Sequence, residues 1–212
     1  MQSEVEISQF ISTKLCHDLA GAIGAVNNSV EFLNSANKNM VAKAHELLKM
    51  SAEQGVNRLV FYRNAYGVSK YSGEANLEEL KLVATNYLKD TKISLDFHER
   101  YFGVKDVFIS TDVGKLILCM IHHAVSNLVH GGDIIITVSK QPSSTRLSIA
   151  AVGDSLKIEN IRDDILNNVN RKHKIDVKNC ISYFAVKFSE LRGVNINVDS
   201  AQSNKIEYIL TF

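Results

Sequence analysis

The first 66 residues carry apolar side chains at helical spacing on two successive segments, and the only proline of the chain, Pro142, lies far beyond them. This pattern predicts a helix over 3–34, a polar turn and a second helix over 40–66, which together form a long hairpin. Two helices cannot bury two full apolar stripes by themselves. We therefore predict that two copies associate through their hairpins into a four-helix bundle; the alternative is that the hairpin packs on its own chain. The expected bundle core consists of Leu15, Leu19, Val26, Leu48 and Leu59.

One histidine stands apart on the first predicted helix. On a helical wheel, His17 lies about 160–180° from the centre of the apolar stripe, so its ring is expected to face solvent. Gly21 and Gly24 share this face, although a glycine inside a helix costs roughly 1 kcal/mol against alanine. They clear side chains from around the imidazole, as the docking of another protein would require. Asn28 lies on the same face and is expected to contact that partner. The simpler alternative is an ordinary surface histidine.

The rest of the chain mixes helical and strand patterns. A linker is expected over 67–74, and Asn76 with an acid three residues later caps a helix that runs to Lys89. Further helices are predicted over 112–130, 159–168 and 177–192, and strands over 93–98, 107–110, 134–140, 146–152, 194–199 and 205–212. This order predicts an α+β sandwich with helices on one face of the sheet. The expected domains are the hairpin, 1–69, and the sandwich, 76–212.

Composition excludes several classes of function. The formal net charge of +1 gives no general attraction to nucleic acid or to an anionic membrane, so neither is an expected partner. No apolar run approaches the roughly 18 residues of a membrane span, and the N-terminus lacks the features of a signal peptide, so we expect a cytoplasmic protein. The three cysteines are isolated and form no CxxC pair, which predicts neither a disulfide framework nor a metal site.

A helical hairpin with His17-Asp18 on its first helix, followed by an α/β sandwich, resembles the core of sensor histidine kinases. The resemblance covers nearly the whole chain. In that family the first helix carries a histidine followed by an acid, and the histidine accepts phosphate from ATP. The ATP is bound by the second domain, which is a GHKL-type sandwich. The resemblance implies that His17 is a phospho-accepting residue.

The nucleotide motifs of that family are degraded in this chain. The segment 123–127, with Asn127 at its end, resembles a remnant of the Asn box. The segment 150–156 stands where Asp-x-Gly-x-Gly is expected, but the acid that reads adenine falls at Ala151 and the second glycine at Ser155. The segment 177–182, where a second glycine-rich box is expected, contains no glycine. Because close backbone approach to phosphates needs glycine, we predict that the ATP site is lost.

The run from Cys16 to Leu33, CHDLAGAIGAVNNSVEFL, is similar to the first helix of the ChpT-like histidine phosphotransferases of alphaproteobacterial phosphorelays. One departure is Ala22, where proline is expected, and it predicts a straighter helix. The resemblance implies a homodimer that binds no cofactor of its own. It also implies that phosphate passes between the aspartates of two receiver domains, one in a hybrid histidine kinase and one in a response regulator. The receiver is expected to bring its own Mg²⁺ and lysine.

Two neighbours of His17 are candidates for supporting roles. Asp18 is a possible orienting group for the imidazole, or simply an acid on the helix surface. Lys14, one turn earlier, is a possible neutraliser of phosphate charge. Two other functions stay open: an ATP-dependent kinase core with a divergent nucleotide site, and a non-catalytic dimeric scaffold. Uptake of phosphate from ATP indicates the first, and failure of His17 to accept phosphate from any receiver indicates the second.

Overall fold

The computed structural model spans residues 1–212 and describes all of them except 1–3, 36, 69–72, 99–107, 158–165 and 167–173. The chain begins with the predicted hairpin, formed by α1 (Glu4–Phe32) and α2 (Lys38–Tyr66). The Asn37 side chain caps α2 by accepting hydrogen bonds from the backbone N–H groups of residues 39 and 40. The helix α1 is continuous through Ala22, which is buried where it lies opposite Gly55 of α2.

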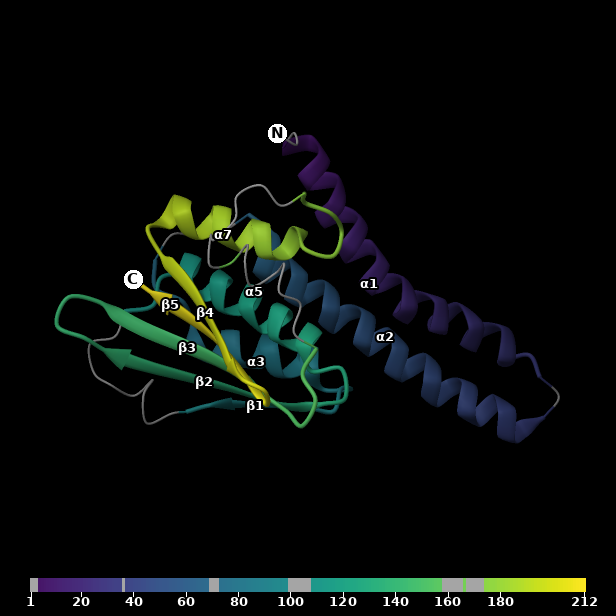
Figure 1. Ribbon diagram of the computed structural model, residues 1–212. Helices are drawn as coiled ribbons and strands as arrows, with labels where there is room; N and C mark the ends of the chain where they lie inside the picture. The colour runs from purple at the N-terminus through teal and green to yellow at the C-terminus, as the bar shows by residue number, and fades with distance from the viewer. Residues whose placement is uncertain (1–3, 36, 69–72, 99–107, 158–165, 167–173) are drawn as a thin grey trace.

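The second part of the chain is a five-stranded sheet in the order β1-β2-β3-β5-β4. The strands are β1 (Ile93–Phe97), β2 (Gly132–Lys140), β3 (Thr145–Val152), β4 (Asn195–Gln202) and β5 (Lys205–Thr211). The pair β1 and β2 is parallel and the other pairs are antiparallel. One face is covered by α3 (Leu77–Leu88), α5 (Thr111–Asn127) and α7 (Cys180–Arg192), as Figure 1 shows. The predicted α+β sandwich with helices on one face is therefore confirmed.

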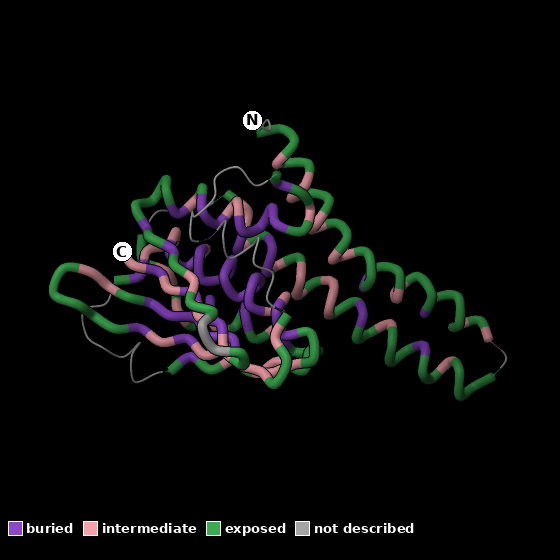
Figure 2. The backbone as a smooth tube through the Cα atoms, viewed as in Figure 1, coloured by how far each residue is buried: buried purple, intermediate pink, exposed green. Residues whose placement is uncertain are grey.

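The core lies between this sheet and its helices, and α5 is buried along nearly its whole length (Figure 2). Strands β2 and β5 alternate between buried and half-buried positions, as strands with one covered face do. The C-terminal end of α2 contributes Phe61, Tyr62 and Ala65 to the same core. The hairpin is thus anchored at one end in the core of the α/β domain and projects from it at the other (Figure 1).

The two halves of the hairpin have different surroundings. Near the sheet, α1 contacts α7, and α2 contacts α3 and α5. Leu15 and Leu19, which we expected in the core of a bundle between two copies, pack against the core of their own chain. In this half the hairpin packs on its own chain. Farther out, several large apolar side chains of the hairpin are exposed: Ile23, Val30, Phe32, Met40, Leu47, Met50 and Val56. Leu59 of α2 lies nearer the α/β domain and is exposed as well.

Three sequence-based boundaries are wrong in part. No strand forms over 108–110, because Ser110 caps α5 by accepting from the N–H of Val113 and makes only an isolated bridge to Glu74. The helix expected to end at residue 130 ends at Asn127. Gly131 follows with φ of 100°, and a side chain there would lie 2.5 Å from the backbone oxygen of Lys92.

The third boundary concerns α7, which begins at Cys180 rather than at residue 177. The carboxylate of Asp176 accepts from the N–H groups of Lys178 and Asn179 and forms a turn in place of the first helical turn. The helix predicted over 159–168 lies outside the described residues except for Leu166, which is helical and buried.

Candidate functional site

His17 lies on the exposed side of α1, near the point where the hairpin leaves the α/β domain. Its side chain is 83% exposed. A Cβ atom built on Gly21 or Gly24 meets no atom of the described residues within 4 Å, so both glycines border open space. Asn28 is exposed as well. The structure thus gives His17 the cleared surroundings that the sequence predicts, and within one chain no close packing requires either glycine.

Asp18 follows His17 directly, but its side chain turns toward the α/β domain and is only 17% exposed. Lys14 Nζ lies 2.8 Å from each of its two carboxylate oxygens, and the Tyr62 hydroxyl lies 3.4 Å from Oδ2. Burial opposes ionisation of this carboxyl. His122 and Lys14 outweigh that effect by hydrogen bonding and charge, and they hold the pKa of Asp18 below its usual range. Asp18 is therefore a carboxylate at neutral pH and not a freely solvated acid.

Behind Asp18 lies His122 of α5, whose ring is buried. The Tyr66 hydroxyl lies 2.6 Å from its Nδ1, and Nε2 lies 3.7 Å from Asp18 Oδ2. Four aromatic rings surround the imidazole, with centroids 5.4 to 6.2 Å away: Phe61, Tyr62, Tyr66 and Tyr87. Burial lowers the pKa of His122, so the ring is neutral near pH 7.

The side chain of Asp18 also approaches the ring of His17. Asp18 Oδ1 lies 3.5 Å from His17 Nδ1, at the outer limit of a hydrogen bond. The backbone carbonyl of Asp18 accepts a hydrogen bond from the Arg58 guanidinium, which ties this turn of α1 to α2. Lys14, expected to neutralise phosphate, has its ammonium group at Asp18. Its role toward phosphate, like the roles of Gly21, Gly24 and Asn28 in docking, stays a prediction.

The helix predicted over 112–130 carries His122, whose ring is buried in the structure. Its link to Asp18 was missed. The available signal was the pair Tyr62 and Tyr66, which lie one turn apart on α2 and present two hydroxyls to the core. A buried hydroxyl needs a polar partner, and a histidine in an otherwise apolar helix is such a partner.

Three positions in the segments that resemble nucleotide motifs pack against other parts of the domain. The Asn127 amide donates a hydrogen bond to the Tyr208 hydroxyl inside the core. Ala151 is fully buried in β3. Gly153 lies so close to Leu128 and Leu156 that a Cβ atom there would be 3.0 Å from one side chain and 3.6 Å from the other. These three positions, which correspond to nucleotide-binding motifs in kinases, serve packing in this domain.

Other chemistries find little support in the described part of the chain. It contains no cluster of His, Cys, Asp and Glu side chains suited to a metal ion. Its helices include none with the length and apolar character needed to cross a membrane. All three cysteines are free, and burial raises the pKa of Cys119 to about 12 and of Cys180 to about 11.

The family model of the histidine phosphotransferase C-terminal domain matches residues 77–204. The chain belongs to the histidine phosphotransferase family, which confirms the resemblance seen in the sequence. Protein phosphotransferase ChpT of Brucella abortus (strain 2308) is 23% identical to it over 197 residues, 92% of this chain and 91% of that protein. A solved structure of a bacterial phosphotransferase shares its fold, with a TM-score of 0.79 and 20% identity, over 99% of this chain and 98% of that one.

Proposed function

We propose that the protein relays a phosphoryl group between the aspartates of two receiver domains through His17. One receiver belongs to a hybrid histidine kinase and the other to a response regulator. The observation that carries this proposal is a histidine exposed by 83%, bordered by two glycines that open onto free space, in a chain of the histidine phosphotransferase family. The exposed face with Gly21, Gly24 and Asn28 is where a receiver docks.

In this proposal His17 attacks the aspartyl phosphate of the receiver. A neutral imidazole has a lone pair on one ring nitrogen, so no separate base is needed near neutral pH. With its proton on Nδ1, which faces Asp18, the ring presents Nε2 to phosphorus. The N–P bond forms while the bond from phosphorus to the aspartate oxygen breaks. Phosphoryl transfer needs mainly in-line positioning and charge neutralisation, and the receiver's Mg²⁺ and lysine supply much of the latter.

We also propose that the protein is a homodimer. The support is the set of exposed apolar side chains along the hairpin, including Ile23 and Val30 of α1, Val56 of α2 and, nearer the α/β domain, Leu59 of α2. Their spacing places each pair on one side of its helix. A second hairpin would cover these side chains and complete a four-helix bundle.

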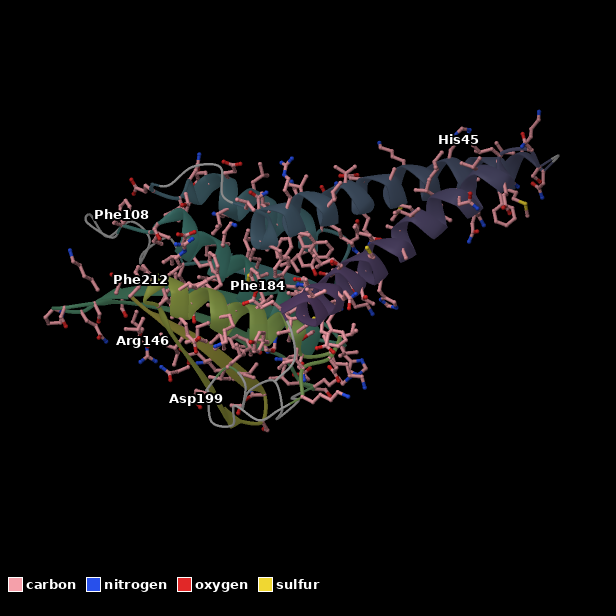
Figure 3. The ribbon with its side chains drawn as sticks, turned by 90° about the horizontal axis from the view of Figure 1, so that it is seen from above. His45, Phe108, Arg146, Phe184, Asp199 and Phe212 are labelled. Carbon is pink, nitrogen blue, oxygen red and sulfur yellow. The ribbon has the colours of Figure 1, made fainter. Side chains whose placement is uncertain are left out.

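The test uses purified protein and receiver domains that carry labelled aspartyl phosphate. Wild-type protein is expected to take up label that is labile to acid and stable to base. His17→Gln removes the label but leaves the fold intact, because the side chain faces solvent. His45→Gln is the matched control, since His45 is another exposed histidine of the hairpin and lies far out along it (Figure 3).

Label taken up from ATP without a receiver would instead favour an ATP-dependent kinase. A wild-type protein that accepts no label from any receiver tested would favour a non-catalytic scaffold. Equal labelling of wild type and His17→Gln would show that another residue is the acceptor.

A further inference from the structure

A line of polar atoms runs from the core of the α/β domain to the candidate phospho-accepting ring. It begins at the Tyr66 hydroxyl, 2.6 Å from Nδ1 of His122. It continues from His122 Nε2 to Asp18 Oδ2 over 3.7 Å, and from Asp18 Oδ1 to His17 Nδ1 over 3.5 Å. Three elements contribute to this line, α2, α5 and α1, and one of them belongs to the domain whose nucleotide motifs are degraded.

The chemistry of the partners fixes where the protons lie. Burial raises the pKa of the Tyr66 hydroxyl well above its usual value, so this group keeps its proton. Because the ionised Asp18 favours a proton on the Nε2 that faces it, Nδ1 of His122 is left to accept from that hydroxyl. A neutral His122 ring that accepts at Nδ1 carries its own proton on Nε2, which faces Asp18. The ionised Asp18 can only accept. The orientation of every group between Tyr66 and Asp18 is thus determined by its neighbour.

On the basis of the function proposed above, we propose that His122 is a positioning residue for phosphotransfer at His17. Its Nε2–H faces the Asp18 carboxylate from the α/β domain at an N···O distance of 3.7 Å and favours the position of that carboxylate by electrostatic attraction rather than by a close hydrogen bond. The other carboxylate oxygen faces Nδ1 of the His17 ring. His122 does not contact the receiver. It acts through Asp18, which keeps the proton of His17 on Nδ1 and leaves the lone pair on Nε2 for attack.

The transfer step explains why a carboxylate is useful at this place. When Nε2 forms its bond to phosphorus, the electron pair of the breaking P–O bond leaves with the receiver's aspartate. The His17 ring keeps its Nδ1 proton and becomes positively charged. A carboxylate 3.5 Å from Nδ1 stabilises that charge. In the second transfer an aspartate oxygen of the other receiver forms a bond to phosphorus while the N–P bond breaks. The electron pair of the N–P bond returns to Nε2, and the ring becomes neutral again.

Packing alone does not account for His122. Four aromatic rings surround the side chain, and burying an imidazole among them has a cost that the contacts of its nitrogen atoms with Tyr66 and Asp18 offset. The adjacent His123 offers an internal comparison. It is also buried on α5, but it lies against the ring of Tyr208 and near Ser182, on the side of the sheet and α7.

The experiment compares His122→Leu with His122→Gln and with His123→Leu as the matched control, all in the full chain. The amide of glutamine reaches the place of Nε2 and restores a donor to Asp18.

Two quantities are measured: the rate of label transfer from a phosphorylated receiver at saturation, and the tautomer of His17 in the unphosphorylated protein from ¹⁵N chemical shifts. We expect His122→Leu to lower the rate roughly tenfold with little change in KM, and to shift His17 toward the Nε2–H tautomer. His122→Gln is expected to recover both, and His123→Leu to change neither.

A wild-type rate and tautomer in folded His122→Leu would overturn the inference, as would equal slowing by His122→Leu and His123→Leu. Failure of a folded His122→Gln to recover would overturn the role of the donor. If His122→Leu does not fold, Tyr66→Phe decides, because it removes only the hydroxyl that fixes the His122 proton and is expected to shift both quantities in the same direction. If the wild type accepts no label at all, the proposed function fails, while the tautomer comparison still tests the link from His122 to His17.

Discussion

At the scale of single residues, the decisive feature is a carboxylate held in its ionised state while largely removed from water. Such a group is tolerated only where opposite charge and hydrogen bonds replace its hydration. For Asp18 these come from its own helix through Lys14, from α2 through Tyr62, and from α5 through His122. The side chain next to the exposed histidine is therefore fixed by three separate elements, which makes its position independent of any docking partner.

The pH dependence of stability follows from the buried ring of His122. Burial lowers its pKa in the folded state, whereas the unfolded chain takes up the proton at the usual value of about 6.5. Below that pH the unfolded state binds more protons, so stability rises with pH and falls as the pH is lowered. We expect wild-type protein to lose up to about 1 kcal/mol of unfolding free energy per pH unit from this group below about pH 6.5.

Urea denaturation at several pH values between about 5 and 8 measures this slope. His122→Leu provides the comparison, because the other histidines stay in place and only the contribution of this ring is removed. A slope that is the same in both proteins would show that the native ring takes up its proton as readily as the unfolded chain does.

At the scale of elements, the helical spacing of apolar residues predicted correctly those features that depend only on which face of a helix is buried. It predicted both hairpin helices, the exposure of His17 and the open side of Gly21 and Gly24. The same spacing did not predict the contacts that a side chain makes with residues far away in the sequence. Asp18 is adjacent to an exposed residue, and its inward turn depends on Tyr62 and His122, which are more than 40 residues away. Ser110 was predicted to end a strand, but in the structure its side chain caps the helix that follows it.

The glycines of α1 give a prediction at this same scale. Gly21→Leu or Gly24→Leu is expected to stabilise the protein by about 0.8–1 kcal/mol, since leucine is a far better helix former and the described chain leaves open space there. The same changes are expected to slow phosphotransfer, because a bulky side chain one or two turns from His17 keeps the receiver's aspartate out of line.

Thermal melting and the rate of label transfer measure the two effects. Gly21→Ala is the matched control, since it gives a similar gain in helix propensity but adds only a methyl group, and it is expected to transfer faster than Gly21→Leu. Transfer at the wild-type rate by both leucine variants would contradict the docking face, even if His17 is still the acceptor.

At the scale of the whole molecule, the α/β domain has the fold of a bacterial phosphotransferase, and its sequence lacks the intact nucleotide motifs that a resemblance to kinases would require. Asn127 and Ala151 are both enclosed in the core, the first through its hydrogen bond to Tyr208. We therefore expect calorimetry with Mg-ATP to detect weak binding or none. A dissociation constant in the low micromolar range would contradict this expectation, and an established ATP-binding protein titrated in the same buffer provides the positive control.

The sequence predicted this loss of motifs but not what takes their place. The missing glycines and the missing acid can be read directly from the amino-acid sequence. The partners that fill the space, such as Tyr208 for Asn127 and Leu156 for Gly153, depend on how distant segments meet in the sheet and are visible only in the fold.

Assembly is the last property at this scale. One side of the inner half of the hairpin packs on its own chain, so a dimer must be held by the outer half together with the uncovered side of α2, where Leu59 is 58% exposed. Leu59→Asp places a charge in the proposed interface, and burying an unpaired charge costs several kcal/mol, so the variant is expected to be monomeric. Leu82→Asp is the matched control, because Leu82 is also 58% exposed but lies on α3 of the α/β domain, and this variant is expected to remain a dimer. Light scattering at equal protein concentration measures the mass of each. A wild-type monomer, or a dimer that survives Leu59→Asp, would show that the exposed apolar face of the hairpin has another occupant.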